Sequence, residues 1–221
     1  MKKISLICIA LIGLGFSSVS IANESSNQAD ISVLKYSNNK EYITLQTEVS
    51  KAPEVVEFFS FYCPHCFDYE TKYGIPKKIQ ENLPNDIKMT KYHVDFMGGM
   101  SPQLSEAWAV AVVLGVDDKV GPAIFDSIHT SRNLKSPSDI LEIFEKVGIS
   151  EAAFNEAKNS VSVGIFQKKQ ENAIKDFQVQ SVPTFYVDGK YMVNTGGLSR
   201  SKPFDEQFSD VINFLLSLDG K

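Results

Sequence analysis

The stretch Cys63-Pro64-His65-Cys66 constrains the fold of this 221-residue chain more than any other. It directly follows an apolar run, 54–62, which predicts a β-strand buried on both faces. Residues 67–82 after it predict a helix. Two cysteines at positions i and i+3 of a first helical turn can close a small disulfide ring. They can also take up and release two electrons with little movement of the backbone.

The N-terminal segment has the layout of a secretory signal peptide. Lys2 and Lys3 precede an apolar stretch, 4–16, and residues 20–22 (Ser-Ile-Ala) form a small-x-small cleavage site. The apolar stretch is shorter than the roughly 20 residues that span a bilayer, which disfavours a membrane anchor. We therefore expect residues 1–22 to be removed on export.

Export places the chain where disulfides persist, and the leader carries away Cys8, the one cysteine outside the motif. Loss of the leader leaves 20 basic against 27 acidic residues, a formal charge of −7. This charge disfavours nucleic acid and anionic membranes as partners. The remaining chain, with 43% hydrophobic residues overall, is long enough for one large domain with an insertion.

The order of predicted elements is strand–helix–strand, a helical stretch, then two strands and a helix. A flexible Ser/Asn-rich tail, 23–40, precedes a short strand at 42–47. The strands at 54–62 and 86–96 then enclose the 67–82 helix in a βαβ unit. Helices follow at 104–114, 119–130, 137–147, 151–159 and 161–177. Strands at 184–187 and 190–193 are joined by an Asp-Gly hairpin turn, and an amphipathic helix occupies 203–218. The fold class is α/β, with one part at 41–97, a helical insertion at 98–172, and a second part at 173–221.

The dithiol has the sequence context of a reactive thiolate. If Cys63 is the N-cap, Pro64 lies at N1, where its missing N–H costs nothing. The N–H groups of His65 and Cys66 and the helix dipole then favour a Cys63 thiolate, and the His65 ring can add a donor or a charge. We therefore expect Cys63 to have a depressed pKa and to be the sulfur that forms a mixed disulfide with substrate, both as nucleophile and as the atom attacked. Cys66 should be more buried and should act as the resolving thiol.

Structural roles for the two cysteines are less favoured. A structural zinc site needs four ligands, and two cysteines with the scattered His65, His93 and His129 make a poor set. A purely structural disulfide would constrain little of the unfolded chain, because only two residues separate the cysteines. Redox chemistry is the favoured role.

Val182-Pro183-Thr184 is a second feature of interest. A proline directly before a strand can simply mark an edge or a start. In the predicted fold, however, Pro183 lies beside the dithiol across the sheet. A cis bond there would turn the Val182 backbone outward, to pair with an extended substrate whatever its sequence.

The segments 57–66, 88–94 and 107–111, with Val182-Pro183 and 188–191, resemble the DsbA family of thiol:disulfide interchange proteins. The resemblance covers roughly residues 40–215. It implies a thioredoxin fold with a helical insertion, and a periplasmic, monomeric oxidase of unfolded exported proteins. A DsbB-like membrane quinone reductase would recharge it. The redox-active Cys63–Cys66 disulfide would be its only redox group, without cofactor or metal.

The resemblance also gives meaning to Glu57, Glu70 and Lys91, which match charges that lie beneath the active site and tune it. A glutamate inside a buried strand is costly unless paired, and Lys91 on the next strand can pair with Glu57. The alternative is that all three are ordinary surface charges. Two departures from the family pattern are Thr184, whose hydroxyl could contact substrate or sulfur, and the 195–198 loop, which lacks a proline and bears on binding of a DsbB-like partner.

The predicted activity is donation of the Cys63–Cys66 disulfide through a Cys63 mixed disulfide. A disulfide isomerase is one alternative, although the roughly 40 residues between a cleaved leader and Cys63 leave no room for an added dimerisation domain. A reductase is another, disfavoured by export and by His65. The third is a peptide-binding chaperone whose disulfide is incidental.

Overall fold

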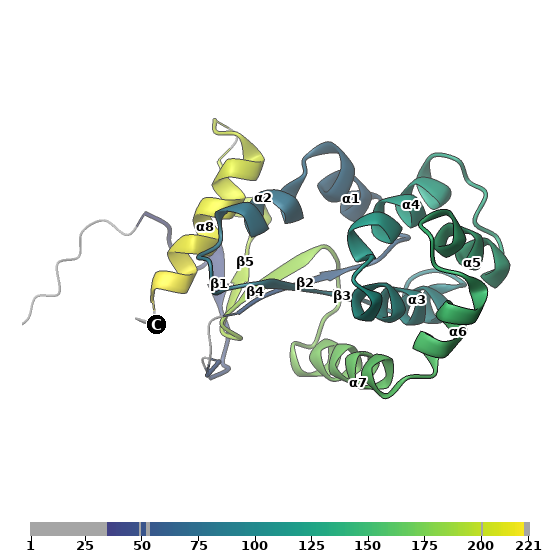
Figure 1. The fold of residues 1–221 in the computed structure, drawn as a ribbon. Helices are drawn as coiled ribbons and strands as arrows, with labels where there is room; N and C mark the ends of the chain where they lie inside the picture. Colours follow the sequence, from purple (N-terminus) through teal and green to yellow (C-terminus); the bar gives the residue numbers. More distant parts are fainter. Residues whose placement is uncertain (1–34, 49, 52–53, 200, 219–221) are drawn as a thin grey trace, which may run out of the picture. The chain divides into compact units, whose positions relative to one another are not determined.

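The computed structural model describes residues 35–48, 50–51, 54–199 and 201–218. The predicted leader, 1–22, and most of the predicted tail lie outside this range. The described chain contains a five-stranded sheet with the order β1-β5-β4-β2-β3 (Figure 1). The strands are β1 (Tyr42–Thr44), β2 (Val55–Phe59), β3 (Met89–His93), β4 (Thr184–Val187) and β5 (Tyr191–Val193).

Strands β2 and β3 are parallel and form the predicted βαβ unit, with Glu57 opposite Lys91 in the register. The connection holds α1 (Pro64–Phe67), a π-helical segment (Asp68–Lys72) and α2 (Ile75–Asn82). The single helix expected at 67–82 was therefore wrong. Helix α1 begins at Pro64, and the path breaks at Gly74, whose φ of 59° lies in the left-handed region that glycine adopts at low cost.

The other strand pairs are antiparallel: β1 with β5, β5 with β4, and β4 with β2. Asp188 and Gly189 connect β4 to β5 with φ values of 53° and 68°. Positive φ at both central residues is the requirement of a type I′ hairpin turn, so the predicted hairpin is confirmed. All five residues of β2 are buried, as expected for a strand covered on both faces.

All the regular elements between β3 and β4 are helices. The helices are α3 (Ser101–Leu114), α4 (Asp117–His129), α5 (Pro137–Lys146), α6 (Glu151–Lys158) and α7 (Val161–Asp176), and α8 (Phe204–Leu218) follows the hairpin. All six were predicted within a few residues. The division into parts at 41–97, 98–172 and 173–221 stays a prediction. Its boundary at 172 falls inside α7.

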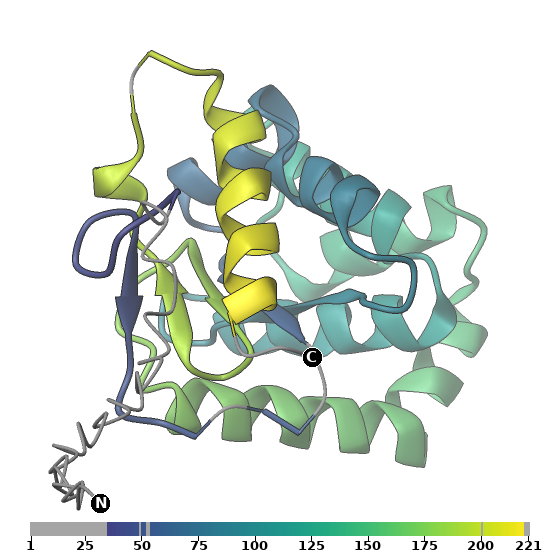
Figure 2. The ribbon, with the colours of Figure 1, turned by 90° about the vertical axis from the view of Figure 1, so that its left-hand side faces the viewer.

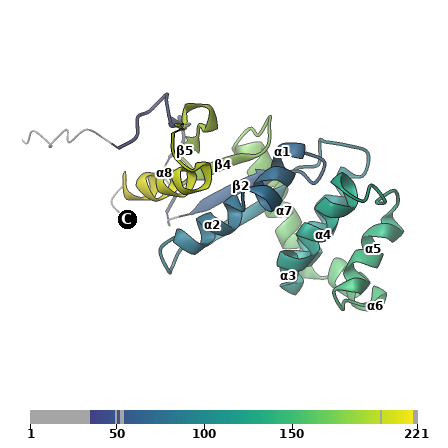
Figure 3. The same cartoon turned by 90° about the horizontal axis from the view of Figure 1, so that it is seen from above.

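Helices cover both faces of the sheet. Helices α2 and α8 lie side by side in both views (Figures 1 and 2) and bury Val55, Phe185 and Val187 beneath them. On the opposite face, α7 packs its C-terminal turns against Phe58 and Tyr186. Seen from above, α3, α4, α5 and α6 gather on the side away from β5 and α8 (Figure 3). None of the described helices is long and apolar enough to cross a bilayer.

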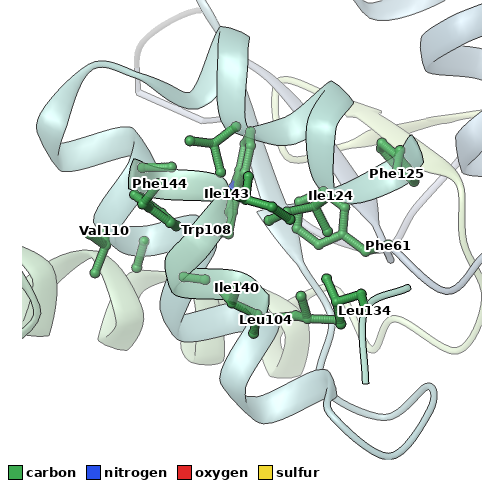
Figure 4. Packing of buried hydrophobic residues seen from close by; sticks show 14 of the residues in the cluster. Phe61, Leu104, Trp108, Val110, Ile124, Phe125, Leu134, Ile140, Ile143 and Phe144 are labelled. Atoms are coloured by element: carbon green, nitrogen blue, oxygen red, sulfur yellow. The ribbon is translucent and has the colours of Figure 1, made fainter. Parts of the chain in front are cut away.

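The helical stretch has its own core, which extends to the dithiol. Phe61, just after β2, packs among Trp108 of α3 and Ile124 and Phe125 of α4 (Figure 4), with its ring centroid 4.9 Å from that of Phe125. Cys63 and Cys66 belong to the same buried cluster. The insertion therefore supplies one wall of the region that holds the two sulfurs.

Candidate active site

Cys63 is the N-cap of α1, as the sequence predicted. Its backbone is extended (φ −84°, ψ 116°), Pro64 occupies the first turn, and the N–H of Cys66 donates to Cys63 Sγ over 3.4 Å. Ser, Thr, Asp and Asn usually fill this position because their side chains accept such a bond. A sulfur in this place accepts it best as a thiolate, since the acceptor then carries a full charge.

The surroundings lower the pKa of Cys63 to about 6. The largest cause is a hydrogen bond from the Cys66 thiol, and burial of the sulfur acts against it. The backbone N–H groups of Cys66 and His65 add to the lowering, and the charge that His65 can carry contributes least. The His65 side chain is exposed. The predicted depression is confirmed, with the helix terminus and Cys66 as its main sources.

Cys66 has the opposite environment. Burial, together with the hydrogen bond to Cys63, raises the pKa of the Cys66 thiol above its ordinary value, so it stays protonated across the physiological range. The side chains are free thiols in this structure. Only 4% of Cys63 and 2% of Cys66 is exposed, so Cys66 is the more buried of the two, as expected, by a small margin. The two sulfurs differ in charge stabilisation far more than in burial.

The segment before β4 reaches the dithiol. The Val182–Pro183 peptide bond is cis, and Cys63 Sγ lies 3.4 Å from the carbonyl oxygen of Val182. The sequence placed both features correctly. The Thr184 hydroxyl donates to the carbonyl of Ser181 over 2.6 Å, so its expected contact with sulfur is absent from the bonds of the described chain. That hydroxyl instead ties the strand start to the preceding turn.

Lys91 joins two carboxylates, of which Glu57 acts electrostatically on Cys66. Its Nζ lies 2.5 Å from Glu70 Oε2 and 3.5 Å from Glu57 Oε2, and the Glu57 side chain is only 2% exposed. Burial raises the pKa of Glu57 to about 7, against the attraction of Lys91. Burial alone would lower the pKa of Lys91, but the two carboxylates outweigh it and hold the pKa above its ordinary value. The surface-charge alternative therefore fails for Glu57 and Lys91, and Glu70 is only partly exposed.

Two histidines that the sequence offered only as poor zinc ligands meet at the active-site segment. His93 Nε2 accepts from the N–H of Phe61 over 3.0 Å, and His129 Nε2 lies 2.8 Å from the Phe61 carbonyl oxygen. Burial lowers the pKa of His93 to about 3, which keeps its ring neutral and able to accept. No spacing in the sequence brings these positions together. Within the described residues no group of three or more His, Cys, Asp and Glu side chains is arranged to hold a metal.

A hollow of about 340 Å³ opens beside α1. It is lined by His65, Asp68, Tyr69, Tyr73 and Phe204. Burial raises the pKa of Tyr69 to about 12, and a hydrogen bond with Thr195 acts the other way. The 195–198 loop therefore touches the wall of this hollow. Its aromatic lining escaped the sequence prediction because Phe204 and Tyr69 are more than a hundred positions apart.

A thioredoxin-type sheet with a low-pKa N-cap cysteine, a protonated partner at i+3 and a facing cis-proline defines a thiol:disulfide oxidoreductase. The chain belongs to the family described as DSBA-like thioredoxin domain, whose sequence model matches residues 54–205. The family, the fold class and the reaction class predicted from the sequence are thereby confirmed.

Relatives agree over most of the chain. It is 44% identical over 188 residues to the thiol:disulfide interchange protein DsbA of Dickeya dadantii, covering 84% of this chain and 91% of that protein. The DsbA of Escherichia coli K12 is 41% identical over 187 residues, with 83% and 90% covered. Among solved structures, Proteus mirabilis DsbA is 40% identical with a TM-score of 0.78, covering 83% of this chain and 98% of that one.

Proposed function

We propose that this protein oxidises pairs of thiols in newly exported proteins by donating a Cys63–Cys66 disulfide. The observation that carries this proposal is the divergence of the two thiols. One has a pKa lowered to about 6, and the other has a pKa raised above its ordinary value. A dithiol that holds one stable thiolate next to one stable thiol is a favourable product, and a favourable reduced form makes a strong oxidant.

The exchange has two steps in which bonds and charges balance. A substrate thiolate attacks Cys63 Sγ, the Cys63–Cys66 bond breaks, and Cys66 leaves and takes up a proton. The second substrate thiolate then attacks the substrate sulfur of the mixed disulfide and expels Cys63 as a thiolate. Two electrons pass from the substrate to the protein. Of the two substrate protons, one ends on Cys66 and one in solvent.

The size of the driving force follows from the pKa of Cys63. Each unit by which that pKa lies below the ambient pH favours the reduced protein by about 1.4 kcal/mol, or about 30 mV for a two-electron couple. A pKa of about 6 thus supplies roughly one such increment at pH 7. Pro64 serves by starting the helix directly after the cap, without an N–H to satisfy.

Substrate would bind in extended form against Val182 and Thr184, beside Pro183. The Val182 carbonyl already lies within 3.4 Å of Cys63 Sγ, so a backbone that pairs there arrives next to the reactive sulfur. A solved complex of a Proteus mirabilis DsbA variant, 40% identical to this chain, holds a non-covalently bound peptide. Backbone pairing explains how one site can serve many sequences.

The setting of the reaction is part of the proposal. The leader pattern at 1–22 supports export to the periplasm, where a DsbB-like membrane quinone reductase would restore the disulfide. The aromatic hollow beside His65, with the 195–198 loop at its wall, is the candidate surface for that partner. The protein would act as a monomer, with no redox group besides its disulfide.

Glu57, Glu70 and Lys91 would tune the dithiol from beneath. The Glu57 charge acts on Cys66, where it disfavours a second thiolate. The three residues form one partly buried ion network, so their effect on the sulfurs is collective.

Equilibration of the Cys63–Cys66 pair against reduced and oxidised glutathione tests the proposal. We expect the disulfide to be reduced by glutathione at ratios typical of DsbA rather than thioredoxin, which differ by about 150 mV. A potential near that of thioredoxin would identify a reductase instead. The chaperone alternative makes a different prediction. The protein would then show no redox activity, and a Cys63→Ser variant would still protect unfolded proteins from aggregation.

A further inference from the structure

Residues 60–63, which lead into the dithiol, form a tight turn. The N–H of Cys63 donates to the Ser60 carbonyl over 3.0 Å, which makes Phe61 and Tyr62 the two central residues of a β-turn. The peptide group between them is the central peptide of that turn. Its N–H, on Tyr62, donates to Ser60 Oγ over 3.2 Å. Its carbonyl, on Phe61, meets His129 Nε2 over 2.8 Å.

His129 reaches this peptide from the last turn of α4. A carbonyl oxygen can only accept, so His129 Nε2 carries the hydrogen in this contact. The imidazole also stacks on the ring of Phe67 in α1, with centroids 4.8 Å apart and planes inclined by 18°. One ring therefore contacts the chain two residues before Cys63 and one residue after Cys66.

We propose that His129 is a positioning residue for the dithiol, through which the helical insertion fixes the geometry of the Cys63 cap. With both ends of the central peptide bonded, its plane is fixed relative to α4. The next residue along the chain is Cys63, whose sulfur must lie in line with the Cys66 N–H. The stacking on Phe67 holds the helix that carries this N–H. His129 acts on the sulfurs through these two contacts and touches neither substrate nor sulfur.

This assignment separates the effect of His129 on redox chemistry from its effect on stability. A residue that merely supports the fold stabilises the oxidised and reduced forms equally, which leaves the equilibrium with glutathione unchanged. A residue that aligns donors on the Cys63 thiolate stabilises the reduced form in particular, because the oxidised form has no thiolate to receive them. The equilibrium constant with glutathione therefore changes if His129 aligns the donors on Cys63. It does not change if His129 stabilises both redox forms equally.

Two substitutions isolate the donor. His129→Gln places an amide N–H where the imidazole Nε2–H lies, and His129→Met fills a similar volume without any donor. Lys119→Met, on an exposed position of the same helix, controls for the introduction of a methionine into α4. Each purified protein is equilibrated with glutathione, and urea melts are recorded for both redox forms.

We expect His129→Met to lower the equilibrium constant for reduction by glutathione about threefold. A change of this size is smaller than the full net contribution of one hydrogen bond. This ratio corresponds to about 14 mV for a two-electron couple. His129→Gln keeps the donor but loses the ring that stacks on Phe67, so its shift should be smaller than that of His129→Met. Lys119→Met should match the unmodified protein. Equal loss of stability in both redox forms of His129→Met, with an unchanged equilibrium constant, would overturn the proposal. So would an equal shift in the Gln and Met variants.

The inference rests on the proposed exchange reaction, but its test can fail separately. If the unmodified protein equilibrates like a reductase, the proposed direction of the reaction is wrong. The ratio between the Met and Gln variants still reports whether His129 positions the dithiol.

Discussion

Cys63 Sγ lies 3.4 Å from the carbonyl oxygen of Val182, although 119 positions separate the two residues. As a thiol, Cys63 donates to this oxygen. As a thiolate it has no hydrogen to give, and it accepts instead from Cys66. The Val182 carbonyl is then available to a backbone N–H of a bound peptide. Ionisation of the sulfur and availability of the proposed substrate-pairing group are therefore linked through one contact.

The roles of the two sulfurs are tested by trapping. Cys66→Ala removes the resolving thiol, so a mixed disulfide formed at Cys63 persists. Exported proteins should accumulate as high-mass bands that disappear on reduction. Cys63→Ala should accumulate none, because the remaining Cys66 thiol is buried and its pKa is raised. Equal trapping by the two variants would show that nucleophile and resolver are wrongly assigned.

The sequence predicted most of the fold and the centre of the site. Strand patterns, the Asp188-Gly189 turn and the helix signals are local, and each gave an element within a few residues. The break at Gly74 was missed because the helical pattern continues on both sides of it. Cys63 and Pro183 were placed because the topology brings strand ends together. The bonds of His93 and His129 to Phe61 were missed because they depend on helix packing in the insertion, which no residue spacing encodes.

His65 should have a small effect on Cys63. The His65→Leu variant keeps the backbone N–H at that position, the Cys66 donors and the helix terminus, and loses only the side-chain charge, the smallest of the five causes. We expect the pKa of Cys63 to rise by less than about one unit. Titration of the thiolate absorbance measures it. A return to about 8.5, the value of a free cysteine, would show that the His65 side chain dominates after all.

Lys91 should be essential to stability. Lys91→Met leaves the buried Glu57 without its cation, and breaking a buried pair in this way costs about 3–5 kcal/mol. The pKa of Glu57 is already raised to about 7, and loss of Lys91 raises it further. The penalty for burying Glu57 grows with pH only up to its folded pKa, so above about pH 7 it levels off in the unmodified protein and continues to grow in the variant. The loss measured in urea should therefore be larger at pH 8 than at pH 5.

Lys77→Met is the matched control for this change, because Lys77 forms an exposed i,i+4 pair with Glu81 at 3.8 Å. Its cost should stay within about 0.5 kcal/mol at either pH. If Lys91→Met behaves like this control, the network beneath the dithiol contributes nothing to the fold.

The stability of the reduced form should pass through a maximum with pH. The pKa of Cys63 is about 6 when folded and about 8.5 when unfolded, so its stabilisation is full above 8.5 and is lost as pH falls through 6. The pKa of Cys66 is raised by folding, so Cys66 destabilises the fold increasingly above pH 8.5. Together they stabilise by about 1.4 kcal/mol at pH 7 and about 2.4 kcal/mol at pH 8, with a maximum near 8.5.

The oxidised form lacks both thiols and gains only the constraint of a four-residue ring, about 1.9 kcal/mol in the chain-entropy account. We therefore expect the reduced protein to unfold at higher urea than the oxidised protein at pH 8, and the order to reverse at pH 6. Paired urea melts of both redox forms at the two pH values decide the matter. A Cys63→Ser, Cys66→Ser double variant, which has no thiolate and no ring, gives the baseline. If the difference between the two redox forms does not change between pH 6 and pH 8, Cys63 has no depressed pKa, and the driving force assigned to the oxidase is absent.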